Sequence, residues 1–262
     1  MEGPPRGTRA TGGLYQFGET LTGNGVPGRR RRAILQRMAE NSSPFFPRLG
    51  FLFAGLGVAC LALAAMQGGI WWLVGWLGFN FLLVGTGYLG LGARIFGKTS
   101  AGRLPLFTKM VFAPYLLYVL LIWHLARLLS REHTVDRVTD GIVVGRRLLA
   151  SELIGEFDVI VDLTSEFQEP AGIRHRPGYV SFPILDAAAP SPRLLREVIT
   201  ALPAGTVFIH CAQGHGRTGL FALALLLHRR EVASIDEGLV LLKTVRPGIE
   251  LSRAQMKCIE GY

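Results

Sequence analysis

The sequence predicts an α/β fold: a sandwich with a central mixed, partly parallel sheet flanked by helices, preceded by an all-α transmembrane hairpin. Two observations predict it. From about Thr134 onward, short apolar runs typical of buried strands alternate with segments typical of helices. Before that point, residues 49–92 are strongly apolar and contain no charged side chain. The first pattern is typical of a layered α/β domain, and the second of helices that cross a bilayer.

The distribution of charge divides the chain into regions. The 262 residues have a formal net charge of +9, and the basic excess is confined to residues 1–48 and 93–109, on either side of the uncharged block. Such flanks favour positive-inside membrane topology, with the lipid bilayer as a partner and no nucleic acid. We predict a basic disordered arm over residues 1–48, a membrane region over 49–132 and an α/β domain over 133–262.

The membrane region contains three apolar segments. Two of them, about 49–66 and 70–92, are long enough to cross a bilayer. The third, about 104–129, contains Lys109 and Pro114, and either spans or lies flat in the interface. If it spans, the α/β domain and the basic arm lie on opposite sides of the membrane. If it lies flat, they share one side.

The α/β domain is predicted to have four strands and four helices. Ser191 precedes a proline at a helix start and is expected to cap that helix. The continuous apolarity of the strand at 157–162 is typical of a central strand buried on both faces. The predicted strands are 141–145, 157–162, 179–183 and 206–209, and the predicted helices are 192–202, 220–227, 234–245 and 252–259.

A Gly-rich turn, His210–Gly219, lies between the predicted strand at 206–209 and the predicted helix at 220–227. A strand, a tight loop and a helix N-terminus together form an anion site, because backbone N–H groups point inward and the helix dipole favours negative charge. Cys211, in that field, is expected to lose its proton easily. Arg217 provides a planar fork that matches two phosphate oxygens.

The pattern His-Cys-x5-Arg-Thr-Gly over His210–Gly219 resembles the signature loop of the cysteine-dependent protein tyrosine and dual-specificity phosphatases. The resemblance covers roughly the last half of the chain, so 133–262 is expected to be a dual-specificity-type phosphatase domain with a phosphatase-type sandwich. It implies that Cys211 attacks phosphorus, that Arg217 and loop amides hold the phosphate oxygens, and that Thr218 donates a hydrogen bond to the sulfur. No metal or other cofactor is expected, because Arg217 and the amides provide the charge. The implied phosphate-binding loop contains His210, Ala212, Gln213, Gly214, His215 and Gly216, with His210 expected to brace it through hydrogen bonds.

A general acid is needed to protonate the leaving oxygen. Asp186 follows the predicted strand at 179–183 in a Pro-x-x-Asp pattern that resembles the family's acid loop. Asp162, at the end of another strand, is the rival, although an acid in an Asp-Leu-Thr sequence more often braces a turn. Arg246, after a helix, resembles a residue in a family turn that supports the site.

The substrate class stays open between phosphoprotein and phospholipid head groups. Phosphoinositide phosphatases of this superfamily have Lys at two loop positions, which here are Ala212 and His215. That difference disfavours polyphosphorylated inositides, whereas a membrane anchor favours a lipid. A catalytically silent adaptor that binds phosphorylated ligands is the alternative function, and the intact Cys211, Arg217 and Asp186 argue against it.

Three scattered cysteines, Cys60, Cys211 and Cys258, show neither a disulfide pattern nor metal-ligand spacing. A catalytic thiolate needs a reducing compartment, which favours the cytosolic side. We therefore expect an integral membrane protein whose phosphatase domain is cytosolic and whose third apolar segment lies flat, while a tilted third span stays open.

Overall fold

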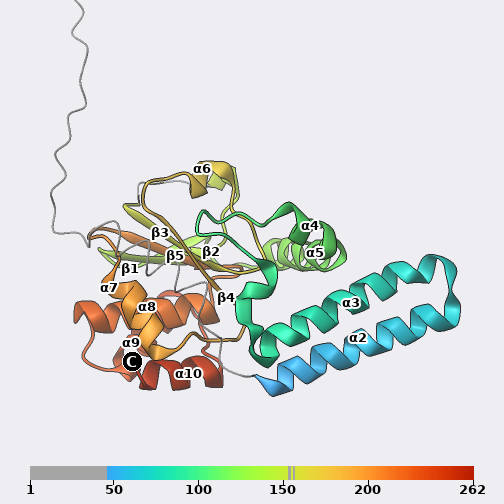
Figure 1. Ribbon diagram of the computed structural model, residues 1–262. Helices are drawn as coiled ribbons and strands as arrows, with labels where there is room; N and C mark the ends of the chain where they lie inside the picture. Colours follow the sequence, from blue (N-terminus) through green and yellow to red (C-terminus); the bar gives the residue numbers. More distant parts are fainter. Residues whose placement is uncertain (1–45, 153–154, 156) are drawn as a thin grey trace, which may run out of the picture.

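An α/β domain forms the C-terminal part of the chain, and a long helical hairpin projects away from it (Figure 1). The computed structural model describes residues 46–152, 155 and 157–262. The predicted basic arm, residues 1–48, therefore lies almost entirely outside the described residues.

The sheet has five strands in the order β1-β2-β5-β3-β4. The strands are β1 (Val135–Thr139), β2 (Ile142–Arg146), β3 (Val159–Thr164), β4 (Tyr179–Ile184) and β5 (Val207–Cys211). β1 pairs antiparallel with β2, and the other neighbours pair parallel, which confirms the predicted mixed, partly parallel sheet. The prediction that the strand at 141–145 comes first was wrong, because β1 precedes it. β1 is an edge strand with polar and half-exposed residues, so it lacks the apolar run that marks a buried strand.

Helices flank the sheet, as the sequence predicted. The main helices, which lie together on one face, are α7 (Pro192–Thr200), α8 (Gly216–Arg229), α9 (Ile235–Val245) and α10 (Arg253–Glu260) (Figure 1). A short helix, α6 (Ala171–Arg174), lies over the opposite face (Figure 1). Its Ile173 packs in a smaller cluster with Val143, Ile160 and Phe208 of the strands. The Ser191 side chain accepts a hydrogen bond from Leu194 N, which confirms the predicted helix cap.

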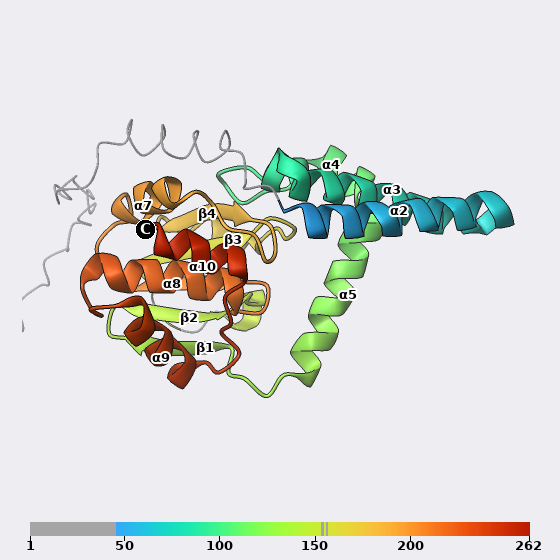
Figure 2. The same ribbon diagram turned by 90° about the horizontal axis from the view of Figure 1, so that it is seen from below.

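The first two apolar segments form an antiparallel helical hairpin. It consists of α2 (Pro47–Gln67) and α3 (Trp72–Thr86), which lie side by side and project from the domain (Figures 1 and 2). A Cβ atom on Gly78 would lie 2.8 Å from the carbonyl oxygen of Gly57, so glycine at this crossing lets the two backbones approach closely. Two helices, Pro47–Gln67 and Gly69–Phe96, are long and apolar enough to cross a membrane.

The third apolar segment is broken into two helices, α4 (Leu106–Val111) and α5 (Ala113–Leu129). Pro114, in the first turn of α5, cannot donate a backbone hydrogen bond to a continuous helix, so the break falls beside it. α5 has 17 residues and runs at a steep angle to the hairpin (Figure 2). Its Trp123 is 2% exposed, and the Trp123 indole N–H donates to the Ala212 carbonyl at 3.0 Å. The end of α5 is therefore packed against the α/β domain.

The loop between the hairpin and α4 also contacts the α/β domain. Lys98 Nζ lies 2.6 Å from Asp162 Oδ2 and donates to the carbonyl of Thr164 at 2.6 Å. The Leu104 N–H donates to Gln168 Oε1 at 3.1 Å. Both ends of the segment from α4 to α5 are thus held at the α/β domain.

The ion pair between Lys98 and Asp162 generates a stability prediction, because both side chains are fully buried. Lys98→Met leaves the Asp162 carboxylate buried without its cation, and we expect it to lower the free energy of unfolding by about 3–5 kcal/mol. Denaturant unfolding of the purified protein in detergent measures this change. Lys109→Met, an exposed lysine on α4, is the control and should change the value by less than about 0.5 kcal/mol. If Lys98→Met changed the free energy of unfolding as little as Lys109→Met does, the ion pair would contribute no stability.

Candidate active site

The Gly-rich turn connects the central strand β5 to α8. Cys211 is the last residue of β5, and α8 begins at Gly216, so the turn brings the thiol to the N-terminus of a helix. Gly214 has a φ of +79°, and a side chain there would collide with the Gly145 carbonyl of β2. Glycine at this position lets the Gly214 N–H turn inward, where it donates to Cys211 Sγ at 3.3 Å.

Arg217 lies in the first turn of α8 and is 2% exposed. Its two terminal nitrogens form a bidentate pair with Glu166, at 3.0 Å and 2.8 Å. Nη1 also donates to the Ile184 carbonyl at 3.0 Å. Burial alone favours the neutral guanidine, but Glu166 and Asp186 raise the pKa of Arg217 well above its ordinary value. Arg217 is therefore a fixed, permanently charged group at the mouth of the turn.

Glu166 is a site residue that sequence reasoning missed. Burial would raise the pKa of Glu166, but Arg217 and the Ser165 hydroxyl lower it below its ordinary value, so the carboxylate stays ionised. The sequence could have indicated Glu166, because this residue comes just after the predicted strand at 157–162. The carboxyl ends of parallel strands meet at one edge of a sheet.

Arg246 supports the turn from behind, as the sequence predicted. Its guanidinium is 1% exposed and donates to the carbonyls of Gly214 at 3.0 Å and Gln213 at 2.9 Å. Glu132 and Asp136, at 2.9 Å and 2.6 Å, balance its charge. The carbonyls of Gln213 and Gly214 therefore point toward Arg246, an orientation that suits anion binding by the amides of the turn.

Two expected hydrogen bonds are not formed within the described part of the chain. The buried Thr218 hydroxyl has no partner among the described residues, and the sulfur of Cys211 instead accepts from Gly214 N–H. His210 Nδ1 likewise has no partner in the described part of the chain, and the ring stacks on Phe208 with 5.4 Å between centroids. Arg246 and Trp123 hold the turn in place of His210, because their side chains donate hydrogen bonds to the turn carbonyls.

Asp186 lies on a loop just after β4 and close to Arg217. Its carboxylate is 79% exposed, and Oδ1 lies 3.4 Å from Arg217 Nη2. The loop is anchored on both sides: the Tyr88 hydroxyl donates to the Asp186 carbonyl at 3.0 Å, and the Ser252 hydroxyl donates to the Ala187 carbonyl at 2.7 Å. The loop backbone at Asp186 is anchored while its carboxylate faces solvent. This arrangement suits a group that exchanges protons with a bound ligand.

Asp162, the rival acid, is placed differently. It is completely buried, with Lys98 and the Tyr179 hydroxyl each 2.6 Å from Oδ2, and Oδ1 accepts from Thr164 N at 2.9 Å. Burial would raise the pKa of Asp162, but Lys98 and His210 lower it well below its ordinary value. Asp162 therefore braces the end of β3 as an ionised group and does not reach the cleft.

One cleft of about 580 Å³ brings Cys211, Arg217 and Asp186 together. The residues of the turn that also line it are Ala212, Gln213, His215 and Gly216. His210, Gly214 and Thr218 are not among the described residues that line the cleft. His215 Nε2 pairs with Glu132 Oε2 at 2.7 Å. Burial alone would raise the pKa of Glu132, but His215 and Arg246 lower it.

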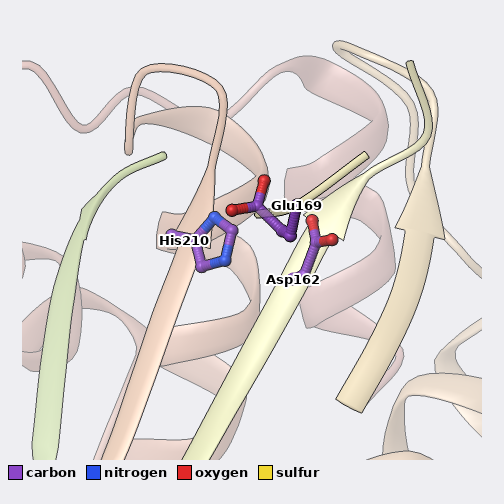
Figure 3. A group of neighbouring side chains, drawn as sticks. All are labelled: Asp162, Glu169 and His210. Carbon is purple, nitrogen blue, oxygen red and sulfur yellow. The ribbon is translucent and has the colours of Figure 1, made fainter. Parts of the chain in front are cut away.

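A second cluster, Asp162, Glu169 and His210, is buried beneath the turn, and its ligand-type atoms all lie within 4.8 Å of one another (Figure 3). Such a set could hold a metal ion. However, Lys98 lies 2.6 Å from Asp162, and Arg147 Nε lies 2.7 Å from Glu169. Since each carboxylate already faces a cation of the chain, we assign the cluster to a buried ion-pair network.

No family model and no curated protein matches this sequence. The solved structures that resemble this chain align with about half of its residues. The active form of Tk-PTP is 25% identical, with a TM-score of 0.44, over 48% of this chain and 94% of that chain. Human DUSP28 is 17% identical, with a TM-score of 0.42, over 49% and 92%. PTPMT1 in complex with PI(5)P is 14% identical, with a TM-score of 0.43, over 49% and 93%.

Proposed function

We propose that this chain is a membrane-anchored, metal-independent phosphatase that hydrolyses phosphomonoesters of phosphoproteins or phospholipid head groups through a cysteinyl-phosphate intermediate. The observation that carries the proposal is the arrangement of Cys211 and the fixed Arg217 on one anion-binding turn, with the Asp186 carboxylate 3.4 Å from that guanidinium. A nucleophile, a cation and a proton donor thus line a single cleft.

The first step transfers the phosphoryl group to sulfur. The Cys211 thiolate attacks phosphorus in line, the S–P bond forms, and the bond to the leaving oxygen breaks. Turn amides and Arg217 hold the three equatorial oxygens, and Glu166 fixes the orientation of the guanidinium fork. Asp186 gives its proton to the leaving oxygen.

The second step releases phosphate. The ionised Asp186 takes a proton from a water molecule, whose oxygen attacks phosphorus and breaks the S–P bond. Inorganic phosphate and the Cys211 thiolate are the products, and Asp186 is protonated again for the next cycle.

We propose the same three regions as above, residues 1–48, 49–132 and 133–262, with the middle one anchored in a bilayer by α2 and α3. Lys98, Tyr88 and Trp123 from that region make hydrogen bonds to the α/β domain. The membrane region is therefore part of the structure that holds the site.

The topology follows from these contacts if α2 and α3 span. The N-terminal end of α2 adjoins the C-terminal end of α3, since Phe46 N–H donates to the Tyr88 carbonyl at 2.8 Å. Both ends of the segment from α4 to α5 contact the α/β domain. We therefore propose that this segment does not cross the membrane and that the α/β domain lies on the same, cytosolic side as the start of α2.

An assay with a small chromogenic aryl phosphate in the presence of EDTA tests the function. We expect turnover to continue with the chelator and to be inhibited by vanadate. Cys211→Ser should lower kcat by on the order of 10³-fold or more, because no nucleophile of comparable strength replaces the thiolate. Activity that vanishes with EDTA would indicate a metal-dependent enzyme. Bound phosphate ligands without any turnover would indicate the adaptor.

The role of Asp186 is tested by the dependence of rate on the leaving group. We expect Asp186→Asn to lower kcat by about 10²-fold or more on alkyl phosphates, whose leaving oxygen needs a proton. On an activated nitrophenyl phosphate the loss should be smaller than about tenfold, because that oxygen leaves without one. Asp140→Asn is the control, because Asp140 lies on an exposed turn that is distant in sequence from Asp186. Equal losses on both substrates would place the acid elsewhere.

The topology is tested with single engineered thiols at Gly3, Gly68 and Gly261 in a variant without the native cysteines. A membrane-impermeant thiol reagent is applied to intact cells, and labelling is read on the purified protein. We expect labelling at Gly68, in the turn of the hairpin, and at neither other position. Labelling at Gly261 as well would show that the α/β domain lies outside the cytosol.

A further inference from the structure

We propose that the substrate is a lipid with a single phosphomonoester, whose phosphate binds at Cys211 while its hydrocarbon chain lies against the membrane hairpin; this rests on the proposed phosphatase function. The cleft of about 580 Å³ is the basis, because its two ends differ in chemistry. One end carries Cys211, Arg217 and Asp186. The other is an apolar wall formed by the membrane region.

The apolar wall comes from three helices. α2 contributes Phe53 and Leu56, α3 contributes Phe81, and α5 contributes Tyr118 and Ile122. The Phe81 and Tyr118 rings pack edge to face, with centroids 6.2 Å apart. These side chains form a surface that holds hydrocarbon well and offers few hydrogen-bond partners.

The wall is continuous with the helices that are long and apolar enough to cross a membrane. It includes residues of α2 and α3, which belong to the two candidate spans. Leu56, Tyr118 and Ile122 are 45%, 45% and 46% exposed, so the apolar end of the cleft opens to the outside of the protein. A lipid can thus enter from the bilayer with its chain remaining in apolar surroundings.

A phosphopeptide fits this wall less well. Its backbone N–H and C=O groups would lie against aromatic and aliphatic side chains and lose their hydrogen bonds to water. A lipid has a polar group only at the end that reaches Cys211. The cleft therefore favours a lipid over a phosphorylated protein.

The polar end is suited to one phosphate. Arg217 is the only lysine or arginine among the described residues that line the cleft, while Glu166, Asp186 and Glu250 line it with negative charge. His215 is already paired with Glu132 at 2.7 Å. A second phosphomonoester on the head group would lie among carboxylates without a free cation, so polyphosphorylated inositides are disfavoured.

The first experiment measures how hydrocarbon length affects hydrolysis. The full-length protein in phosphatidylcholine nanodiscs hydrolyses butyl and octyl phosphate, and the ratio of their kcat/KM values is taken. Since each buried methylene contributes about fourfold, we expect octyl phosphate to be favoured by at least about tenfold. Ile122→Ser should lower this ratio at least about threefold, whereas the matched control Leu121→Ser, on the same helix but outside the cleft lining, should leave it unchanged.

Partitioning of octyl phosphate into the disc affects both variants alike, so an unchanged ratio in Ile122→Ser would overturn the proposal.

The second experiment compares phosphatidic acid in the disc with a soluble phosphotyrosine peptide, each measured by phosphate release. Faster release from phosphatidic acid supports a lipid substrate. Faster release from the peptide overturns it while leaving the phosphatase function intact. If the chain has no phosphatase activity at all, the chromogenic aryl phosphate assay shows no turnover. That result is distinct from a preference for the peptide.

Discussion

The buried guanidinium of Arg217 is the group on which the organisation of the site depends. It joins Glu166 after β3, the carbonyl of Ile184 at the end of β4, and the turn that follows β5. A single charge thus links the carboxyl ends of three parallel strands. Because removing one partner of a buried ion pair leaves the other without compensation, the positions of Glu166 and Arg217 depend on each other.

The same principle, a buried cation facing a carboxylate, recurs around the turn. Arg246 pairs with Glu132 and Asp136 behind it, and Lys98 pairs with Asp162 beneath it. These pairs place positive charge behind and beneath the turn, and Arg246 also donates to the turn carbonyls of Gln213 and Gly214. The Gly214 N–H faces Cys211 Sγ, which is the orientation that anion binding at the turn requires.

The helical hairpin, α5 and the α/β domain form one structure. Trp123 of α5 donates to a carbonyl of the turn, and Tyr88, beyond α3, holds the backbone of Asp186. The apolar wall of the cleft belongs to the same helices. The helical hairpin and α5 therefore contribute side chains to the cleft itself.

The sequence by itself determined the features that depend on neighbouring residues. These include the turn between β5 and α8 that presents Cys211 and Arg217, the alternation of strands and helices, the cap at Ser191 and the two long apolar helices. Each follows from local periodicity, turn chemistry or residue type. The tertiary structure decided the rest. The partners Arg217 and Glu166 are 51 residues apart, Lys98 and Asp162 are 64 apart, and Trp123 and Ala212 are 89 apart. The hydrophobic pattern of a segment specifies which face is buried but not which distant side chain it meets, so these contacts, the edge strand β1 and the placement of α5 were decided only when the sheet and helices packed together.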